Sequence, residues 1–183
     1  MNYRLSVRAS TRITTRRRLG IRLAACLATA LLAWSAAAPA DPPSDWTFHP
    51  LDEALKLAQQ EQRRVFLYFG RHGCPSCDKT NRQSFTDPRV IEKYRANYVL
   101  AYADAESGER LRLPSGERVT EMELGVKLKV FGTPFFYFME PDGTPVYRAP
   151  GYQSAEEFLL FDRYVNGGHY KQQTFAEFKA DQS

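Results

Sequence analysis

The sequence predicts an α/β fold with a central mixed sheet flanked by helices. Three apolar runs have the length of strands, at residues 65–70, 97–102 and 135–139, and segments with helical patterns separate them. Apolar runs without alternation are typical of strands that are buried on both faces. Strands that alternate with helices imply parallel pairs joined by crossovers, and a short turn at residues 141–144 adds an antiparallel hairpin.

The N-terminal half of this fold is expected to hold three helices and two strands. Pro50 precedes an amphipathic helix over residues 51–64, because proline and acidic residues suit the first turn of a helix. The polar segment that follows the first strand is compatible with a second helix. Asp87 is a good N-cap and predicts a third helix from Pro88 to Tyr94, before the second strand.

The C-terminal half begins with a polar loop at residues 103–119, in which a small hairpin is expected. Helices are then predicted to begin at Thr120 and at Ser154, because a glutamate three residues later completes a capping box at each position. The first of these helices is expected to end near Val130. A last short helix is expected over residues 175–179.

The charges of the chain are divided unevenly along it. The 183 residues carry a formal net charge of +4 at pH 7, but residues 1–40 contain seven arginines and no acidic residue. Residues 41–183 therefore hold 18 Lys and Arg against 21 Asp and Glu, a net charge of −3. A domain with this balance lacks the basic excess that is typical of nucleic-acid binding, so we expect no nucleic-acid partner.

Residues 1–40 are predicted to be a secretory signal peptide. A segment rich in arginine ends at Arg22, and an apolar run of about 16 residues and the small residues 38–40 follow in the order that signal peptides have. The run is shorter than the ~20 residues that span a bilayer, so a cleaved peptide is favoured over a membrane anchor. Cys26 lies inside this segment and is expected to be discarded with it.

Export would place the mature chain in the periplasm of a bacterium, where disulfides can form. The predicted domain organisation is a signal peptide over residues 1–40, a linker over 41–49 and a single domain over 50–183. The mature chain keeps Cys74 and Cys77, and one pair argues against a scaffold that is held together by disulfides.

The segment Cys74-Pro75-Ser76-Cys77 lies between a predicted strand and a predicted helix, which favours redox chemistry. At a helix N-terminus, free backbone N–H groups and the positive end of the dipole stabilise a thiolate, so Cys74 is expected to be more acidic than a free thiol. Cys77 lies one turn further in, and Pro75 constrains the first turn. Cys74 should therefore attack a substrate disulfide, which Cys77 then resolves. His72 either stabilises the thiolate when protonated or is an ordinary loop residue.

Two other roles for the cysteine pair are weaker. A structural zinc site needs four ligands, but the chain has no second Cys-x-x-Cys, and His49, His72 and His169 are scattered. A purely structural disulfide that closes so short a loop would add little stability. We therefore expect no metal and no bound cofactor.

These features together resemble the thioredoxin superfamily. The strand, the Cys-Pro-Ser-Cys segment and the helix are followed far downstream by Gly132-Thr133-Pro134, a strand, Asp142-Gly143 and another strand. The resemblance implies that the peptide bond before Pro134 is cis and that this proline packs beside the cysteine pair. It also implies that the Thr133 backbone binds an extended substrate peptide.

Two positions depart from thioredoxin itself. Gly73 stands where thioredoxin has a tryptophan before its first cysteine, and Tyr68 stands where thioredoxin has a buried aspartate. The usual proton acceptor for the resolving cysteine, here Cys77, is therefore missing. The alternatives for this role are Glu53, Asp78 or a water molecule.

Within the superfamily, the chain most resembles the periplasmic thioredoxin-related group that includes SoxW, through residues 85–90, 151–152 and 164–175. The resemblance implies an exported thiol–disulfide oxidoreductase that reduces protein disulfides in the envelope and receives electrons from a membrane thiol transporter. The alternative is a peptide-binding or chaperone-like module that uses the groove at Thr133 and Pro134 without turnover.

Overall fold

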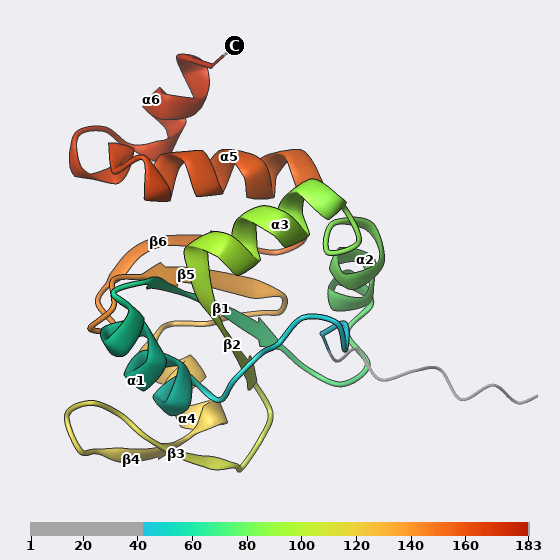
Figure 1. Ribbon diagram of the computed structural model, residues 1–183. Helices are drawn as coiled ribbons and strands as arrows, with labels where there is room; N and C mark the ends of the chain where they lie inside the picture. The colour runs from blue at the N-terminus through green and yellow to red at the C-terminus, as the bar shows by residue number, and fades with distance from the viewer. Residues whose placement is uncertain (1–41, 183) are drawn as a thin grey trace, which may run out of the picture. The chain divides into compact units, whose positions relative to one another are not determined.

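The computed structural model describes residues 42–182, so the predicted signal peptide and Cys26 fall outside the described part of the chain. Figure 1 shows how its elements are arranged. In chain order they are α1 (Leu51–Glu61), β1 (Arg64–Gly70), α2 (Pro75–Gln83), α3 (Pro88–Asn97), β2 (Tyr98–Asp104), β3 (Arg110–Arg112), β4 (Arg118–Thr120), α4 (Glu121–Lys127), β5 (Phe135–Met139), β6 (Pro145–Pro150), α5 (Ala155–Asn166), the 3-10 helix η1 (His169–Lys171) and α6 (Phe175–Ala180).

The central sheet has the strand order β2-β1-β5-β6, and β3 and β4 form a separate hairpin. β1 is parallel to β2, whereas β5 is antiparallel to both β1 and β6. The predicted mixed sheet is confirmed, but the expectation of repeated parallel pairs is wrong for β5. β2 ends opposite Gly70 and β5 begins opposite Phe69, so the hairpin and α4 return the chain to the same end of the sheet.

The segment before α1 closes the outer edge of β2. The His49 N–H donates to the Leu100 carbonyl at 2.9 Å, and the Tyr102 N–H donates to the His49 carbonyl at 3.0 Å. Trp46 is only 3% exposed, and its indole N–H donates to the Phe85 carbonyl at 3.0 Å. The folded part of the chain therefore includes the end of the segment that the sequence assigned to a linker.

The two faces of the central sheet are covered by different helices and different side chains (Figure 1). On the aliphatic face, α1, α4 and the β3–β4 hairpin pack against Val65 and Leu67 of β1. On the aromatic face, α2, α3 and α5 pack against Phe66 and Tyr68 of the same strand. Successive side chains of a strand point to opposite faces, which explains how one apolar run supplies both layers.

The helix boundaries follow the predicted capping signals closely. Thr120 and Ser154 each form a complete capping box with the glutamate three residues later, and the Asp87 side chain accepts from the Arg89 N–H. The hairpin in the polar loop is also confirmed. α4 is shorter than expected, because Lys129 takes a left-handed conformation with φ of 57° and ends the helix.

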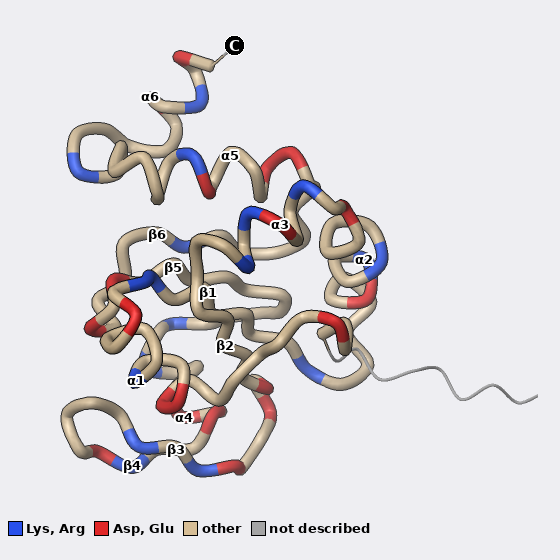
Figure 2. The backbone as a smooth tube through the Cα atoms, viewed as in Figure 1, with Lys and Arg blue, Asp and Glu red and all other residues tan. Residues whose placement is uncertain are grey.

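Most charged residues lie on the helices, the hairpin and the loops, while β1, β2 and β6 carry one each and β5 has none (Figure 2). This distribution fits a sheet that is covered by helices on both faces. Within residues 42–182, no helix combines the length and the apolar character that crossing a membrane requires.

Candidate active site

Cys74 and Cys77 are joined by a disulfide at the N-terminus of α2, with their Cα atoms 5.2 Å apart. Cys74 is the N-cap residue in an extended conformation, and Pro75 is the first residue of the helix. β1 ends at Gly70, so a three-residue turn links the buried strand to the cysteine pair. Gly73 in this turn has a φ of 65°, a conformation that favours glycine and would strain the tryptophan of thioredoxin.

Three polar groups surround the sulfur of Cys74. The Cys77 N–H donates to Cys74 Sγ at 3.1 Å, and the Thr133 hydroxyl donates to the same atom at 3.3 Å. The Thr133 carbonyl oxygen lies 3.5 Å from it. Once the disulfide is reduced, the two donors and the helix N-terminus are placed to stabilise a thiolate on Cys74.

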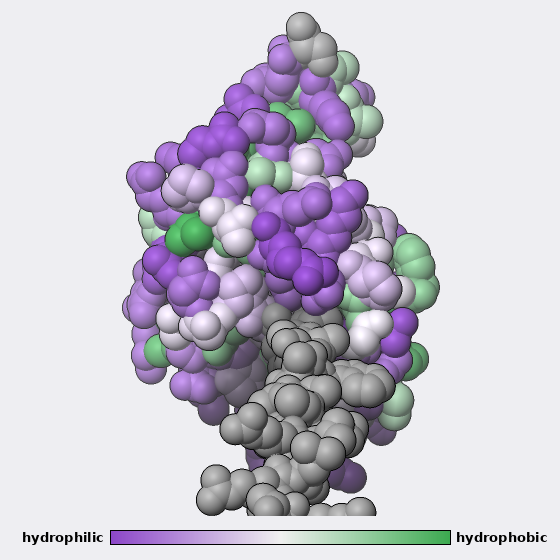
Figure 3. All heavy atoms as spheres, turned by 90° about the vertical axis from the view of Figure 1, so that its right-hand side faces the viewer, coloured by the Kyte–Doolittle hydropathy of each residue, from purple (hydrophilic) through white to green (hydrophobic). Residues whose placement is uncertain are grey.

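The two cysteines are not equally accessible. Cys77 is 0% exposed on the inner face of α2, and Cys74 retains 3% of its surface at the end of the helix. The outer surface over α2, which faces the viewer in Figure 3, is mostly hydrophilic. Both cysteines are thus buried, and Cys74, the N-cap at the end of α2, is the less shielded of the two.

The Thr133–Pro134 peptide bond is cis, as the resemblance to thioredoxins implies, and Pro134 is buried. The Pro134 carbonyl accepts a hydrogen bond from the Gly151 N–H at 2.8 Å, which connects this turn to the end of β6. The structure thus brings Thr133 and Cys74 together, although 59 residues separate them in the chain.

Residues after β6 connect the turn at Pro134 to α2. The Lys79 ammonium lies 3.9 Å from the centre of the Tyr152 ring, and the Tyr152 hydroxyl donates to Gln83 at 3.1 Å. The Ser84 hydroxyl donates to the Gln153 carbonyl at 2.6 Å. Sequence reasoning noted Tyr152 only as part of a subgroup pattern, because no local spacing connects it to α2.

Tyr68 occupies the aromatic core that also contains Cys77. Its hydroxyl donates to the Asn81 side-chain oxygen at 3.4 Å, and Asn81 lies one helical turn after Cys77. Asn81 was not identified from the sequence, although a spacing of four residues on a helix is a usable signal. Where thioredoxin has its buried acid, this chain therefore has Tyr68, whose hydroxyl is hydrogen-bonded to Asn81.

The expected substitutes for that acid lie elsewhere. Glu53 pairs with His49 at 3.5 Å on α1, which covers the other face of the sheet. Asp78 follows Cys77, but its carboxylate pairs with Arg82 at 2.7 Å on the outer side of α2. His72 is exposed in the turn before Cys74.

Cations near the cysteine pair in the sequence are engaged with other partners. Arg71 pairs with Glu106 at 3.3 Å, and Lys79 lies over the Tyr152 ring. The local hydrogen-bond donors and the helix N-terminus are therefore the main groups that the structure offers to a Cys74 thiolate. Among residues 42–182, no group of three or more His, Cys, Asp and Glu side chains is arranged to hold a metal ion.

Comparison with known proteins agrees with this geometry. The family model described as "Thioredoxin-like domain" matches residues 51–166. The chain is 32% identical over 111 residues to the thiol:disulfide interchange protein DsbD of Ralstonia nicotianae, an alignment that covers 60% of this chain and 16% of that protein. The chain thus spans only a small part of this relative.

Solved structures give a similar result. A thioredoxin from Thermus thermophilus is 33% identical with a TM-score of 0.53, over 64% of this chain and 85% of that one. A thioredoxin-fold protein from Helicobacter pylori has a TM-score of 0.58 at 17% identity, over 67% of this chain and 88% of that one. The second likeness concerns the fold alone.

Proposed function

The chain belongs to the family of thioredoxin-like domains, and from this premise we propose that it is a protein thiol–disulfide oxidoreductase of the periplasm. The observation that carries the proposal is the Cys74–Cys77 disulfide at the N-terminus of α2, with Thr133 hydrogen-bonded to the Cys74 sulfur. A disulfide at a helix N-terminus that closes so short a loop, with Cys74 the less shielded of the two cysteines, suits an exchange reaction better than a structural role.

The proposed reaction consists of two exchange steps. In the reduced protein, the Cys74 thiolate attacks one sulfur of a substrate disulfide, forms a mixed disulfide and releases the other substrate sulfur as a thiol. The Cys77 thiolate then attacks Cys74 Sγ and releases the second substrate thiol. Two electrons pass to the substrate, and the Cys74–Cys77 disulfide is the oxidised product.

The next cycle requires a dithiol donor that reduces this disulfide. We propose that the donor is a membrane thiol transporter and that the clients are disulfide-bonded envelope proteins, as in the SoxW-like group. The similarity to part of a thiol:disulfide interchange protein supports disulfide exchange, and the direction of electron flow is proposed from the resemblance to the SoxW-like group alone. The proposal includes export by a signal peptide over residues 1–40, which leaves residues 41–49 ahead of the predicted domain at 50–183.

Thr133 and Pro134 are proposed to bind the substrate backbone beside Cys74. The buried Pro134 and its bond to Gly151 hold the turn in place, and the Thr133 carbonyl lies close to the reacting sulfur. Pro75 is proposed to influence the thiol chemistry through the first turn of α2, and exposed His72 through its charge when protonated.

Trapping with cysteine variants tests the proposal. In the Cys77→Ser variant, mixed disulfides through Cys74 should accumulate with envelope proteins and should disappear on treatment with dithiothreitol. The Cys74→Ser variant is the matched control and should trap nothing. If Cys77→Ser traps no protein while Cys74→Ser still binds unfolded peptides with the wild-type affinity, the chain is a peptide-binding module instead.

The reduction potential of the Cys74–Cys77 pair tests the direction of electron flow. A value near that of thioredoxin, about −270 mV, supports a reductase, and a value near about −120 mV supports an oxidase. Equilibration with glutathione or dithiothreitol buffers, followed by quantification of free thiols, provides the measurement.

A further inference from the structure

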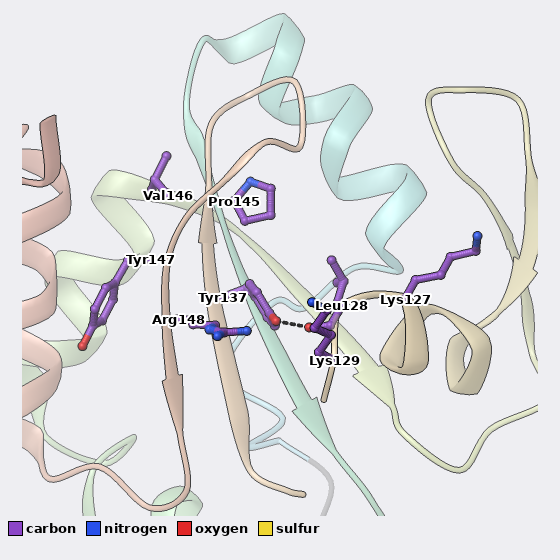
Figure 4. Close-up of a pocket in the computed structure, with 8 residues that line it drawn as sticks. All are labelled: Lys127, Leu128, Lys129, Tyr137, Pro145, Val146, Tyr147 and Arg148. Carbon is purple, nitrogen blue, oxygen red and sulfur yellow. Dashed lines mark hydrogen bonds between the residues drawn. The ribbon is translucent and has the colours of Figure 1, made fainter. Parts of the chain in front are cut away.

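A second candidate site lies away from the cysteine pair, at the outer strand β6 of the central sheet. The C-terminal end of α4 and the strands β5 and β6 enclose an open pocket of about 410 Å³. Figure 4 shows its lining residues, which are Lys127, Leu128, Lys129, Tyr137, Pro145, Val146, Tyr147 and Arg148. The Tyr137 hydroxyl donates to the Leu128 carbonyl and ties the floor of the pocket to the end of α4 (Figure 4).

The pocket is basic, although the domain as a whole is acidic. Three cations and no carboxylate line it among the described residues. Lys127 pairs with Glu117 at 3.0 Å, and in Figure 4 its side chain extends away from Tyr137. Within residues 42–182, Lys129 and Arg148 have no carboxylate at ion-pair distance, so two charges are available to a ligand.

Lys129 has a backbone conformation that is unfavourable for a residue with a side chain. The Lys129 N–H bonds to the Val126 carbonyl at 3.0 Å and the Val130 N–H bonds to the Gly125 carbonyl at 2.9 Å, which is the hydrogen-bond pattern of a Schellman helix end. The left-handed position of this motif, here φ 57°, is usually occupied by glycine. A lysine in that position fits a requirement for its side chain at the pocket.

A row of rings connects the pocket to the turn at Thr133. Phe131 is 80% exposed and packs edge-on against Phe135 at 5.3 Å, and Phe135 stacks on Tyr137 at 5.2 Å. Thr133 and Tyr137 are four residues apart, which is at most about 13 Å of chain, because the cis bond before Pro134 shortens the segment. A polypeptide whose cysteine reacts with Cys74 can therefore cover Phe131 and reach the pocket with roughly four or five residues.

Backbone pairing with β6 is a less suitable way to bind such a segment. β6 is the outer strand of the described sheet, but Pro145 and Pro150 lie at its two ends and have no N–H to donate. Prolines and an outward-facing Arg148 are typical features that discourage the pairing of edge strands. Recognition at this edge is thus expected to use side chains.

We propose that the pocket is an accessory site for an acidic side chain of the redox partner, four or five residues from the partner's reactive cysteine. This inference rests on the proposed oxidoreductase function and extends it to the class of partner. The partner segment would carry an apolar residue against Phe131 and a glutamate or aspartate between Lys129 and Arg148.

Two model peptides test the proposal. Each peptide has a cysteine that forms a mixed disulfide with a fluorescent thiol, and a leucine two residues after this cysteine. The peptides differ only in the residue five positions after the cysteine, which is glutamate in one and glutamine in the other. We expect the wild type to reduce the glutamate peptide with a KM about two to five times lower, as for an exposed ion pair, and with the same kcat. The ratio should approach one in 0.5 M salt, because salt screens exposed charges.

The double variant Lys129→Asn, Arg148→Gln should reduce both peptides with equal KM, since asparagine tolerates the left-handed conformation. A Lys56→Gln, Lys93→Gln variant loses the same charge at exposed positions on α1 and α3 and should keep the preference. Equal KM values in the wild type, or a preference that persists in Lys129→Asn, Arg148→Gln, would overturn the proposal.

A binding measurement separates this inference from the redox proposal. The Cys74→Ser, Cys77→Ser protein cannot exchange disulfides, but fluorescence anisotropy should still show tighter binding of the glutamate peptide. If the wild type reduces neither peptide while this preference remains, the oxidoreductase proposal fails, and with it the assignment of the pocket to a redox partner, although the pocket still binds an acidic side chain. If both peptides bind equally and both are reduced, the pocket proposal alone fails.

Discussion

The aromatic and aliphatic faces of the central sheet share the same strands but are packed in different ways. On the aromatic face, the Phe66 ring lies among other rings, which are those of Phe85, Tyr94, Tyr98, Phe136, Phe138 and Phe158. On the aliphatic face, Leu55 borders a cavity of about 270 Å³ between α1, the hairpin loop and α4. Phe66 is thus enclosed by rings, whereas Leu55 borders open space.

The difference corresponds to the two sites of the molecule. Cys74 and Cys77 belong to the aromatic core, where interlocked rings hold α2 in a fixed position relative to the sheet. The basic pocket with Lys129 and Arg148 lies at the β6 edge of the sheet, where Tyr137 of its lining belongs to the aliphatic face and Tyr147 packs against the aromatic core. Chemistry that depends on precise placement is thus embedded in the aromatic core, and the proposed partner recognition lies at the outer strand of the sheet.

The largest effect is expected from Phe66→Ala, which should lower the free energy of unfolding by about 4 kcal/mol, because it leaves a cavity and removes ring–ring contacts. Leu55→Ala should cost only about 2 kcal/mol, since its side chain already borders open space where the surroundings can adjust. Urea denaturation of both variants provides the comparison. Equal costs would show that the two layers are packed equally well.

A smaller effect is expected from Trp46→Phe, which tests whether the segment before α1 is part of the aromatic layer. The variant keeps an aromatic ring but removes the N–H that donates to the Phe85 carbonyl, so unfolding should become easier by about 1–2 kcal/mol. Phe48→Leu, at a partly buried ring stacked on Trp46, is the matched control and should cost less. A Trp46→Phe protein as stable as the wild type would contradict the assignment.

Local patterns in the sequence were sufficient for much of the fold. Capping boxes placed the starts of α4 and α5, apolar runs placed the strands, and the cysteine spacing identified the candidate site. Each of these signals depends on residues within a few positions of one another, where backbone hydrogen bonds and helix geometry dictate the spacing. The cis bond before Pro134 came from the resemblance to thioredoxins, since no local signal distinguishes it.

Contacts between distant segments could not be predicted in this way. The stretch before α1 begins with the composition of a linker, and contacts with distant residues, such as that between Trp46 and Phe85, 39 residues away, make its end part of the fold. The direction of β5 depends on where the hairpin and α4 return the chain. The link from Tyr152 to Lys79, and the pocket between α4 and β6, likewise form only when the whole sheet is assembled.

Two carboxylates on the helices of opposite faces should give stability profiles of opposite sign. At the start of α3, the hydrogen bond from the Arg89 side chain lowers the pKa of Asp87. The contribution of Asp87 to the free energy of unfolding is present above its pKa in the unfolded chain, about 3.9, and is lost as the pH falls through its lowered pKa in the folded protein. At the start of α4, burial raises the pKa of Glu121. Its contribution to the free energy of unfolding is therefore present below its pKa in the unfolded chain, about 4.3, and is lost as the pH rises through its raised pKa in the folded protein.

Thermal unfolding between pH 2 and 7 tests these signs. Asp87→Asn keeps the N-cap, and the advantage of the wild type over it should shrink as the pH falls below about 4. Glu121→Gln should gain stability relative to the wild type as the pH rises from about 4 to 7. Both differences should stay within about 1 kcal/mol. Slopes of the same sign for the two variants would contradict the assigned causes.

The smallest effect is expected at the contact that ties α2 to the loop after β6. A double-mutant cycle with Lys79→Met and Tyr152→Leu should give a coupling of about 0.5 kcal/mol, as for an exposed cation over a ring. The Lys171–Tyr170 pair is the matched control, because its ammonium lies 5.7 Å from the ring centre rather than 3.9 Å, and its coupling should be smaller. A coupling near zero for the Lys79–Tyr152 pair would mean that this contact adds nothing to the attachment of α2. In that case the ring packing of the aromatic face, together with the Ser84–Gln153 hydrogen bond, positions the cysteine pair.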